Sequence, residues 1–95
     1  MISYIKGKLV HKEPGFALIE ANGIGYHIKI SLQTYTQLGE SELCTLLTHF
    51  HVREDAQLLY GFKTEEERGI FQLLISISGV GSNTALVILS SMSPA

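Results

Sequence analysis

The spacing of apolar side chains changes after Gly61, and this change constrains the fold more than any other feature of the sequence. Up to Phe62, apolar and polar residues alternate with a period of two, which is typical of strands that bury one face. Beyond Gly61 the apolar residues recur at helical spacing. We therefore expect a β domain over residues 1–62, followed by a helical part over residues 64–95.

The pattern of residues 1–62 predicts five strands and one short helix. The Asn22-Gly23 pair indicates a tight hairpin, because both central residues of such a turn must tolerate positive φ. The expected strands cover Tyr4–Val10, Phe16–Ala21, the segment containing Tyr26, Ile28 and Ile30, Glu42–Arg53 and Gln57–Phe62, with a helix over Ser31–Leu38 capped by Ser31 and ended by Gly39. Five strands with a helix between the third and fourth are the order of a small Greek-key barrel, the oligonucleotide-binding (OB) fold.

Two helices are expected after the barrel. Thr64 and Glu67 have the spacing of a capping box, in which the threonine accepts from the first turn and the glutamate reaches back. Ser82 is expected to cap the second helix. The predicted apolar stripes are Ile70, Leu73, Leu74 and Ile77 on the first helix, and Ala85, Ile88, Leu89 and Met92 on the second. Helices this short need another surface, because chains below roughly 40 residues rarely fold unaided. That surface is the barrel, a partner chain or further sequence, and we expect the chain to be a fragment of a longer protein.

Composition restricts the classes of protein. A formal net charge of −2 argues against a general nucleic-acid coat, although it leaves room for a local binding site. Met1–Lys6 lacks the apolar run of a signal peptide, and no segment approaches the roughly 20 apolar residues of a membrane span. A single cysteine, Cys44, excludes an internal disulfide and is predicted to lie in the core with Leu46. These features favour a cytoplasmic protein.

The segment Gly79-Val80-Gly81, between the two predicted helices, is the candidate binding site. Glycines allow a tight turn, and Val80 is expected to fill the gap between the helices. The amides of the turn and of the next helix's first residues would then face one anion, helped by the helix dipole. We therefore predict phosphate binding by residues 79–83, which include Ser82 and Asn83. The alternative is an ordinary helix connection that happens to use glycine.

Charged residues near the last two strands supply further candidates. Glu54 and Asp55 lie between these strands, where acids are common in solvated turns. Beside bound DNA, the same acids would repel phosphates and help to part the strands. The candidate phosphate contacts are Lys6, Lys8, Lys29 and Arg53, each of which also fits plain surface charge.

His49 and His51 share a strand face with Arg53. A His-x-His pair can bind zinc, but no third or fourth ligand has suitable spacing, so we predict a polar strand face and no metal.

These residues carry a family resemblance. The chain resembles the RuvA family, the Holliday-junction-recognition subunits of the RuvAB branch-migration complex, in register over its whole length. The matching segments are Met1-Ile2, Gly23-Ile24-Gly25-Tyr26, Thr48 to Phe62, Glu67-Arg68, Phe71, Leu74-Ile75, Gly79-Val80-Gly81, and Ala85-Leu86 to Ile88-Leu89-Ser90.

The resemblance implies a non-catalytic subunit that binds four-way junction DNA in recombination and repair. It implies homotetramers, or octamers on DNA, and partners that include a RuvB-type AAA+ ATPase and a RuvC-type resolvase. ATP and magnesium would serve the motor, and no cofactor is expected on this chain. By position, Glu54 and Asp55 match the family's acidic pin, and Gly79 to Asn83 match the first of its two DNA-gripping hairpins.

The chain also departs from the family. The second hairpin, the linker and the motor-binding domain have no counterpart in it, which implies weak junction binding and no coupling to the motor. Where the family usually has a basic side chain just after the glycine turn, this sequence has Ser82-Asn83. Two other functions remain open: a pure oligomerisation or protein-interaction module, and a metal-dependent hydrolase using His49, His51, Glu54 and Asp55.

Overall fold

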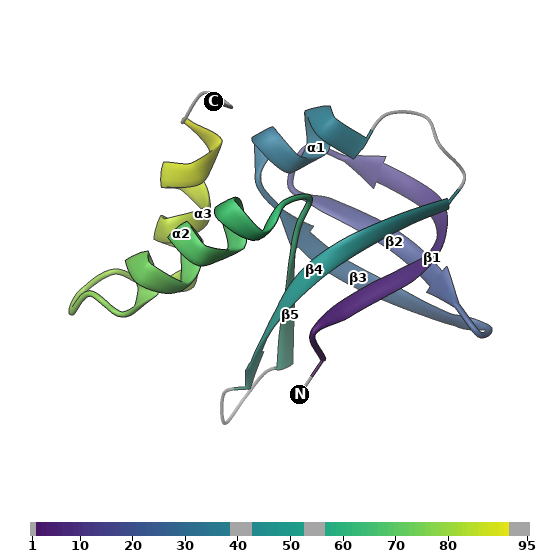
Figure 1. Cartoon of the computed structure of the whole chain (residues 1–95), viewed down its shortest axis with the longest axis horizontal. Coiled ribbons are helices and arrows are strands. Elements are labelled where there is room, and N and C mark those ends of the chain that lie inside the picture. Colours follow the sequence, from purple (N-terminus) through teal and green to yellow (C-terminus); the bar gives the residue numbers. More distant parts are fainter. Residues whose placement is uncertain (1, 39–42, 53–56, 92–95) are drawn as a thin grey trace.

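The computed structural model describes residues 2–38, 43–52 and 57–91. It contains a closed five-stranded barrel beside a pair of helices (Figure 1). The elements are β1 (Tyr4–Glu13), β2 (Phe16–Ala21), β3 (Ile24–Ile30), α1 (Leu32–Leu38), β4 (Leu43–Val52), β5 (Gln57–Phe62), α2 (Glu65–Ile75) and α3 (Ser82–Ser90). The predicted OB-type barrel followed by helices is confirmed.

The barrel closes in the order β1-β2-β3-β5-β4, with β4 returning to β1. The ten-residue strand β1 makes this possible, because its first half pairs with β4 and its second half with β2. Its register with β2 shifts between Leu9 and His11, where a bulge bends the strand. Strands β3 and β5 form a parallel pair, and the other pairs are antiparallel.

The expected hairpin between β2 and β3 is also confirmed. Asn22 and Gly23 both have positive φ, 52° and 80°, as a two-residue turn with the twist of a hairpin requires. Ser31 caps α1 as predicted, since its Oγ accepts a hydrogen bond from the Thr34 amide at 3.1 Å. Helix α1 packs Leu38 into the barrel core.

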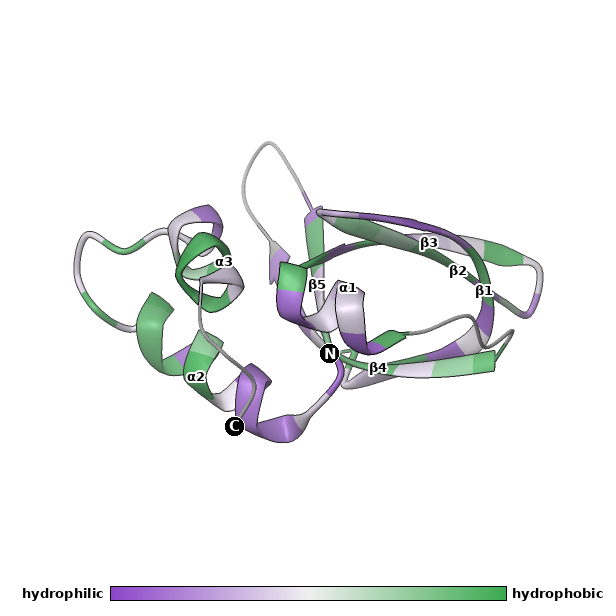
Figure 2. Ribbon diagram, turned by 90° about the horizontal axis from the view of Figure 1, so that it is seen from above, coloured by the Kyte–Doolittle hydropathy of each residue, from purple (hydrophilic) through white to green (hydrophobic). Residues whose placement is uncertain are grey.

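Strand β5 is the wall between two cores. Leu59 belongs to the barrel core, whereas Tyr60 and Phe62 belong to a second cluster with Phe71 of α2 and with Ala85 and Leu89 of α3. This division follows from the period of two, because successive side chains of a strand point to opposite faces. The helix pair therefore forms a separate layer beside the barrel (Figure 2).

The predicted core is confirmed at Cys44 and Leu46, which are buried in the barrel. Burial raises the pKa of the Cys44 thiol, and the nearby charge of Lys63 opposes this shift. In α3, Ala85 and Leu89 are buried as expected, and Ile88 is half-buried. Met92 lies outside the described residues.

The stripe expected on the first helix is wrong in part. Leu73 is 68% exposed and Ile77 is 52% exposed, whereas the fully buried positions of α2 are Glu67 and Phe71. The barrel-facing side is thus rotated from the predicted one, because the predicted stripe was built from aliphatic residues alone and the buried side includes the polar Glu67. Ile77 also lies beyond the end of α2 at Ile75.

The predicted cap of α2 is confirmed in part, and the predicted cap of α3 is wrong. Thr64 does cap α2, since its side chain accepts from the Glu67 amide at 3.2 Å. The Glu67 carboxylate, however, accepts from the hydroxyls of Ser31 and Thr34 rather than reaching back to Thr64. The N-cap of α3 is Gly81 and not Ser82, which is the first helical residue.

The close packing around Gly61 of β5 gives a prediction about stability. A Cβ at Gly61 would lie 2.5 Å from Ile28 Cγ2 and 3.1 Å from Leu46 Cδ1, inside the barrel core. We expect Gly61→Ala to lower the free energy of unfolding by about 1–3 kcal/mol in urea denaturation, as overpacking does. The control is Gly69→Ala, because Gly69 is exposed in α2 and no atom lies within 4 Å of the place that its methyl group would take. There we expect a gain of roughly 0.5–1 kcal/mol from helix propensity. Equal stability of both variants would contradict this packing.

Candidate nucleic-acid interface

The turn between α2 and α3 needs glycine at one of its two glycine positions. Gly79 has φ of +88°, a conformation that residues with a side chain rarely adopt. Gly81 has φ of −81° and is extended, so its backbone is open to other residues. No atom lies within 4 Å of a Cβ built at either position. The tight turn expected from two glycines therefore requires glycine by its backbone angle only at Gly79, and the space beside both residues is open.

Val80 fills the gap between the helices as predicted. Its side chain is half-buried and packs against the cluster that contains Tyr60, Phe71 and Ala85. Its amide donates to the Ile77 carbonyl at 3.1 Å, which closes the turn. The apolar residue thus holds the turn in place while the glycines on both sides stay exposed.

The amides of Gly79 and Gly81 are available to an anion. Among the described residues, none accepts a hydrogen bond from the amides of Gly79 or Gly81. The first N–H groups of a helix have no partner within the helix, and Gly81 supplies no side-chain cap to α3. The positive end of the α3 dipole adds to these donors. The arrangement is chemically suited to phosphate.

The side chain of Ser82 faces the barrel. Its Oγ accepts a hydrogen bond from the Tyr60 hydroxyl at 2.8 Å, and the residue is 4% exposed. Its hydroxyl is therefore engaged within the protein, and of the two side chains after the turn only Asn83 is exposed. Sequence reasoning missed Tyr60, because nothing in its spacing shows that β5 contacts the start of α3.

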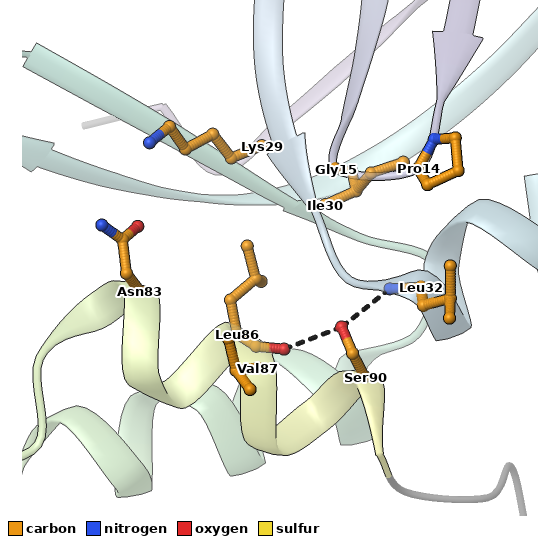
Figure 3. Close-up of a pocket in the computed structure, with 9 residues that line it drawn as sticks. All are labelled: Pro14, Gly15, Lys29, Ile30, Leu32, Asn83, Leu86, Val87 and Ser90. Carbon is orange, nitrogen blue, oxygen red and sulfur yellow. Dashed lines mark hydrogen bonds between the residues drawn. The ribbon is translucent and has the colours of Figure 1, made fainter.

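A groove with a volume of about 450 Å³ runs between the barrel and α3 (Figure 3). Lys29 of β3 and Asn83 of α3 line it, together with apolar residues that include Leu86. The Ser90 hydroxyl accepts from the Leu32 amide at 3.0 Å and donates to the Leu86 carbonyl at 2.9 Å. The groove thus brings one of the predicted cations, Lys29, to the side of α3 that carries Asn83.

Lys6 and Lys8 do not line this groove. Lys6 and Lys8 are exposed on β1, opposite Thr45 and Leu43 of β4. Arg53, Glu54 and Asp55 lie outside the described residues. They belong to the segment between β4 and β5, whose antiparallel pairing runs to Val52 and Gln57.

Of the two strand histidines, His49 packs against α2. The His49 ring packs edge-on against Phe71 at 5.4 Å, and its Nδ1 lies 3.5 Å from Nε2 of Gln72. His51 lies 6.3 Å from it, ring centre to ring centre. Within residues 2–38, 43–52 and 57–91, no three histidine, cysteine, aspartate or glutamate side chains gather as metal ligands. In the same part of the chain, no helix has the length and apolar character to cross a membrane.

A closed barrel of five strands, with a helix between β3 and β4, defines the chain as an OB-fold protein, here extended by a packed helix pair. Residues 1–61 match the family model described as the RuvA N-terminal domain. The chain belongs to the RuvA family.

Curated relatives extend the similarity beyond the barrel. The chain is 51% identical over 94 residues to the Holliday junction branch migration complex subunit RuvA of Christiangramia forsetii, covering 99% of this chain and 49% of that protein. It is 50% identical over 95 residues to the protein of the same name from Bacteroides fragilis, covering 100% and 47%. The protein of that name from Francisella tularensis subsp. novicida is 50% identical over 93 residues, covering 97% and 43%. The chain spans about half the length of these relatives.

The packing of His49 gives a prediction about pH. Burial under α2 lowers the pKa of His49, and the charges of His51 and Arg68 lower it further. Because the folded state disfavours the protonated ring, the unfolded state binds more protons as pH falls below about 6.5, the usual pKa of histidine. We expect the free energy of unfolding to fall between pH 7.5 and 5.5, and His49→Gln to remove part of that fall. Urea denaturation at both pH values measures this, and an unchanged pH dependence in His49→Gln would contradict it.

Proposed function

We propose that this chain is the junction-binding part of a RuvA-type subunit, which binds four-way junction DNA and takes no part in bond chemistry itself. Its relatives carry the name of a Holliday junction branch migration complex subunit. In this proposal ATP and magnesium act on a partner motor of the RuvB type, and a RuvC-type resolvase acts on the same junction. The assembly is a cytoplasmic homotetramer, or an octamer on DNA, that serves in recombination and repair.

One observation carries this proposal: the similarity to RuvA proteins runs through α2, the glycine turn and α3 as well as through the barrel. The family model ends at residue 61, whereas the identity of about 50% extends over 93 to 95 residues. The exposed residues Gly79 and Gly81, whose amides have no acceptor among the described residues, lie in the part that the relatives share.

The proposed grip holds phosphate through backbone amides within residues 79–83, those of Gly79, Gly81 and Asn83. A protein with a net charge of −2 gains little from general attraction to DNA, so placed donors must supply the affinity. Asn83 brings no charge where the family usually has a basic side chain, and Lys29 in the same groove supplies it from the barrel. Lys6, Lys8 and Arg53 are additional contacts along other parts of the backbone.

A single grip of this kind is weak, and repetition makes it useful. Four copies around a junction hold several arms at once, and each further contact becomes intramolecular. In that arrangement Glu54 and Asp55 lie near the crossover, where their charges repel phosphates and keep the strands apart. The grip and the acidic pair thus have opposite tasks, one attractive and one repulsive.

A gel shift tests the proposed function. We expect the chain to bind a four-way junction more tightly than a linear duplex of the same sequence at matched salt. Gly81→Val should weaken junction binding by roughly tenfold, because a side chain then stands between the amides and the phosphate, and hydrogen bonds to charged groups contribute about 1.5–3 kcal/mol. The extended backbone and open space at Gly81 admit valine without a clash.

The matched control is Gly25→Val, at an exposed strand position where a Cβ would meet only Leu18 Cδ1, at 3.8 Å. This variant should bind as the unchanged chain does. Equal affinity for junction and duplex would sink the junction proposal and favour an interaction module. Unchanged binding by a folded Gly81→Val would remove the role of the turn.

The acidic pair gives a second prediction. Replacing Glu54 and Asp55 by Gln and Asn removes two negative charges, so DNA affinity in the same assay should stay constant or rise. Each close pair of like charges costs about 1 kcal/mol in water. A marked loss of junction affinity would show that these acids do not act by repulsion.

Metal analysis of the purified protein separates this role from the alternative of a metal-dependent hydrolase, which needs stoichiometric zinc or manganese.

A further inference from the structure

The contact between the helix pair and the barrel is largely apolar. Phe71 of α2 lies against both barrel aromatics of the second cluster, at ring-centre distances of 5.1 Å from Tyr60 and 4.9 Å from Phe62. Apolar contact is not directional, because it depends on the area removed from water. Such a contact attaches the helices to β5 but does not by itself fix their angle to the barrel.

A buried carboxylate ties the start of α2 to the start of α1. Glu67 is 3% exposed, and its Oε2 accepts from the Ser31 hydroxyl at 2.5 Å, while its Oε1 accepts from the Thr34 hydroxyl. Both hydroxyls accept in turn from the backbone: Ser31 Oγ from the Thr34 amide, and Thr34 Oγ1 from the Lys63 amide at 3.3 Å. Each hydroxyl therefore uses its single proton on the carboxylate, and the network is directional throughout.

A second buried contact ties β5 to the start of α3. The Tyr60 hydroxyl donates to Ser82 Oγ at 2.8 Å, and both residues are buried. Ser82 follows Gly81 directly, so this hydrogen bond acts on the residue next to the proposed phosphate grip. The two contacts hold different helices, one at Glu67 and the other at Ser82. Two separated points fix an orientation that one point leaves free to turn.

We propose that Glu67 and Tyr60 are positioning residues, which set the angle of the α2–α3 pair to the barrel and thereby aim the glycine turn. The effect on DNA rests on the proposed function above, whereas the effect on orientation does not. Stability alone is a poor account of Glu67, because buried charges are costly to desolvate and apolar replacements are often as stable. A satisfied polar network instead favours one arrangement over near alternatives.

The first experiment measures orientation in the 95-residue chain. Residual dipolar couplings of backbone amides, taken separately for the barrel and for α2–α3, report their relative angle. Glu67→Gln keeps the shape of the side chain, but its N–H₂ group cannot accept the hydroxyl proton that a carboxylate oxygen accepts. The matched control is Glu66→Gln, an exposed neighbour that undergoes the same change of charge. Tyr60→Phe, which removes one oxygen atom, is the second variant should Glu67→Gln not fold.

We expect Glu67→Gln and Tyr60→Phe to change the relative orientation or to let the two parts reorient separately, and Glu66→Gln to leave the couplings as they are. Unchanged couplings in either folded test variant would overturn its assignment as a positioning residue. An equal change in Glu66→Gln would overturn the assignment of Glu67, since charge alone would then explain it.

The second experiment measures the preference for junction over duplex in the same variants. A changed orientation of the α2–α3 pair should reduce the preference for junction over duplex by roughly threefold to tenfold, without a matching loss of duplex binding. A proportionate loss on both DNAs would indicate general weakening and overturn the aiming role. If the unchanged chain binds no DNA, the proposed function fails, and the couplings still decide whether Glu67 and Tyr60 set the orientation.

Discussion

Strand β5 is buried on both faces and contributes side chains to both cores of the protein. One face of this strand closes the barrel core through Leu59, and the other gives Tyr60 and Phe62 to the helix pair. Helices of 11 and 9 residues are marginal alone in water, so their stability comes from this shared surface. Gly61 lies on the barrel side of this strand, and because it has no side chain it leaves room for Ile28 and Leu46 in the barrel core. A strand with two buried faces therefore links the fold of the barrel to the position of the candidate site.

The candidate site depends on that link. Phe71, Ala85 and Leu89 bury the inner sides of α2 and α3, and Val80 packs below the turn that joins them. Gly79, Gly81 and Asn83 stay exposed, and the amides of the two glycines have no acceptor among the described residues. Phosphate recognition by backbone needs no charged side chain but does need the donors to be held in place. The net negative charge of the chain and the packing of Val80 below the turn both fit phosphate binding by backbone amides.

Much of the fold was predictable because it follows from local pattern. Alternation along the strands, the positive φ of Asn22 and Gly23, and the cap at Ser31 each depend on neighbouring residues alone. The buried side of α2 was not predictable, because the buried Glu67 carboxylate accepts hydrogen bonds from hydroxyls far away in the chain. These belong to Ser31 and Thr34, which precede it by 36 and 33 residues. The exposure of Leu73 follows from the same rotation. Gly79 and Val80 were identified from the sequence, whereas the role of Ser82 was not, because its partner Tyr60 lies in another element. Pattern locates a face of a helix only while apolar and polar residues keep to opposite sides.

The most direct test of the account is an NMR titration of the chain with a four-way junction that follows each backbone amide. We expect the largest chemical-shift changes at Gly79, Gly81 and Asn83, a smaller group at Lys29 and the rest of the groove, and little change at Gly25. The changes should shrink together as salt is raised, because phosphate contacts release counterions. Shifts confined to the barrel, with the amides of the glycine turn unmoved at saturation, would contradict the claim that this turn grips the DNA.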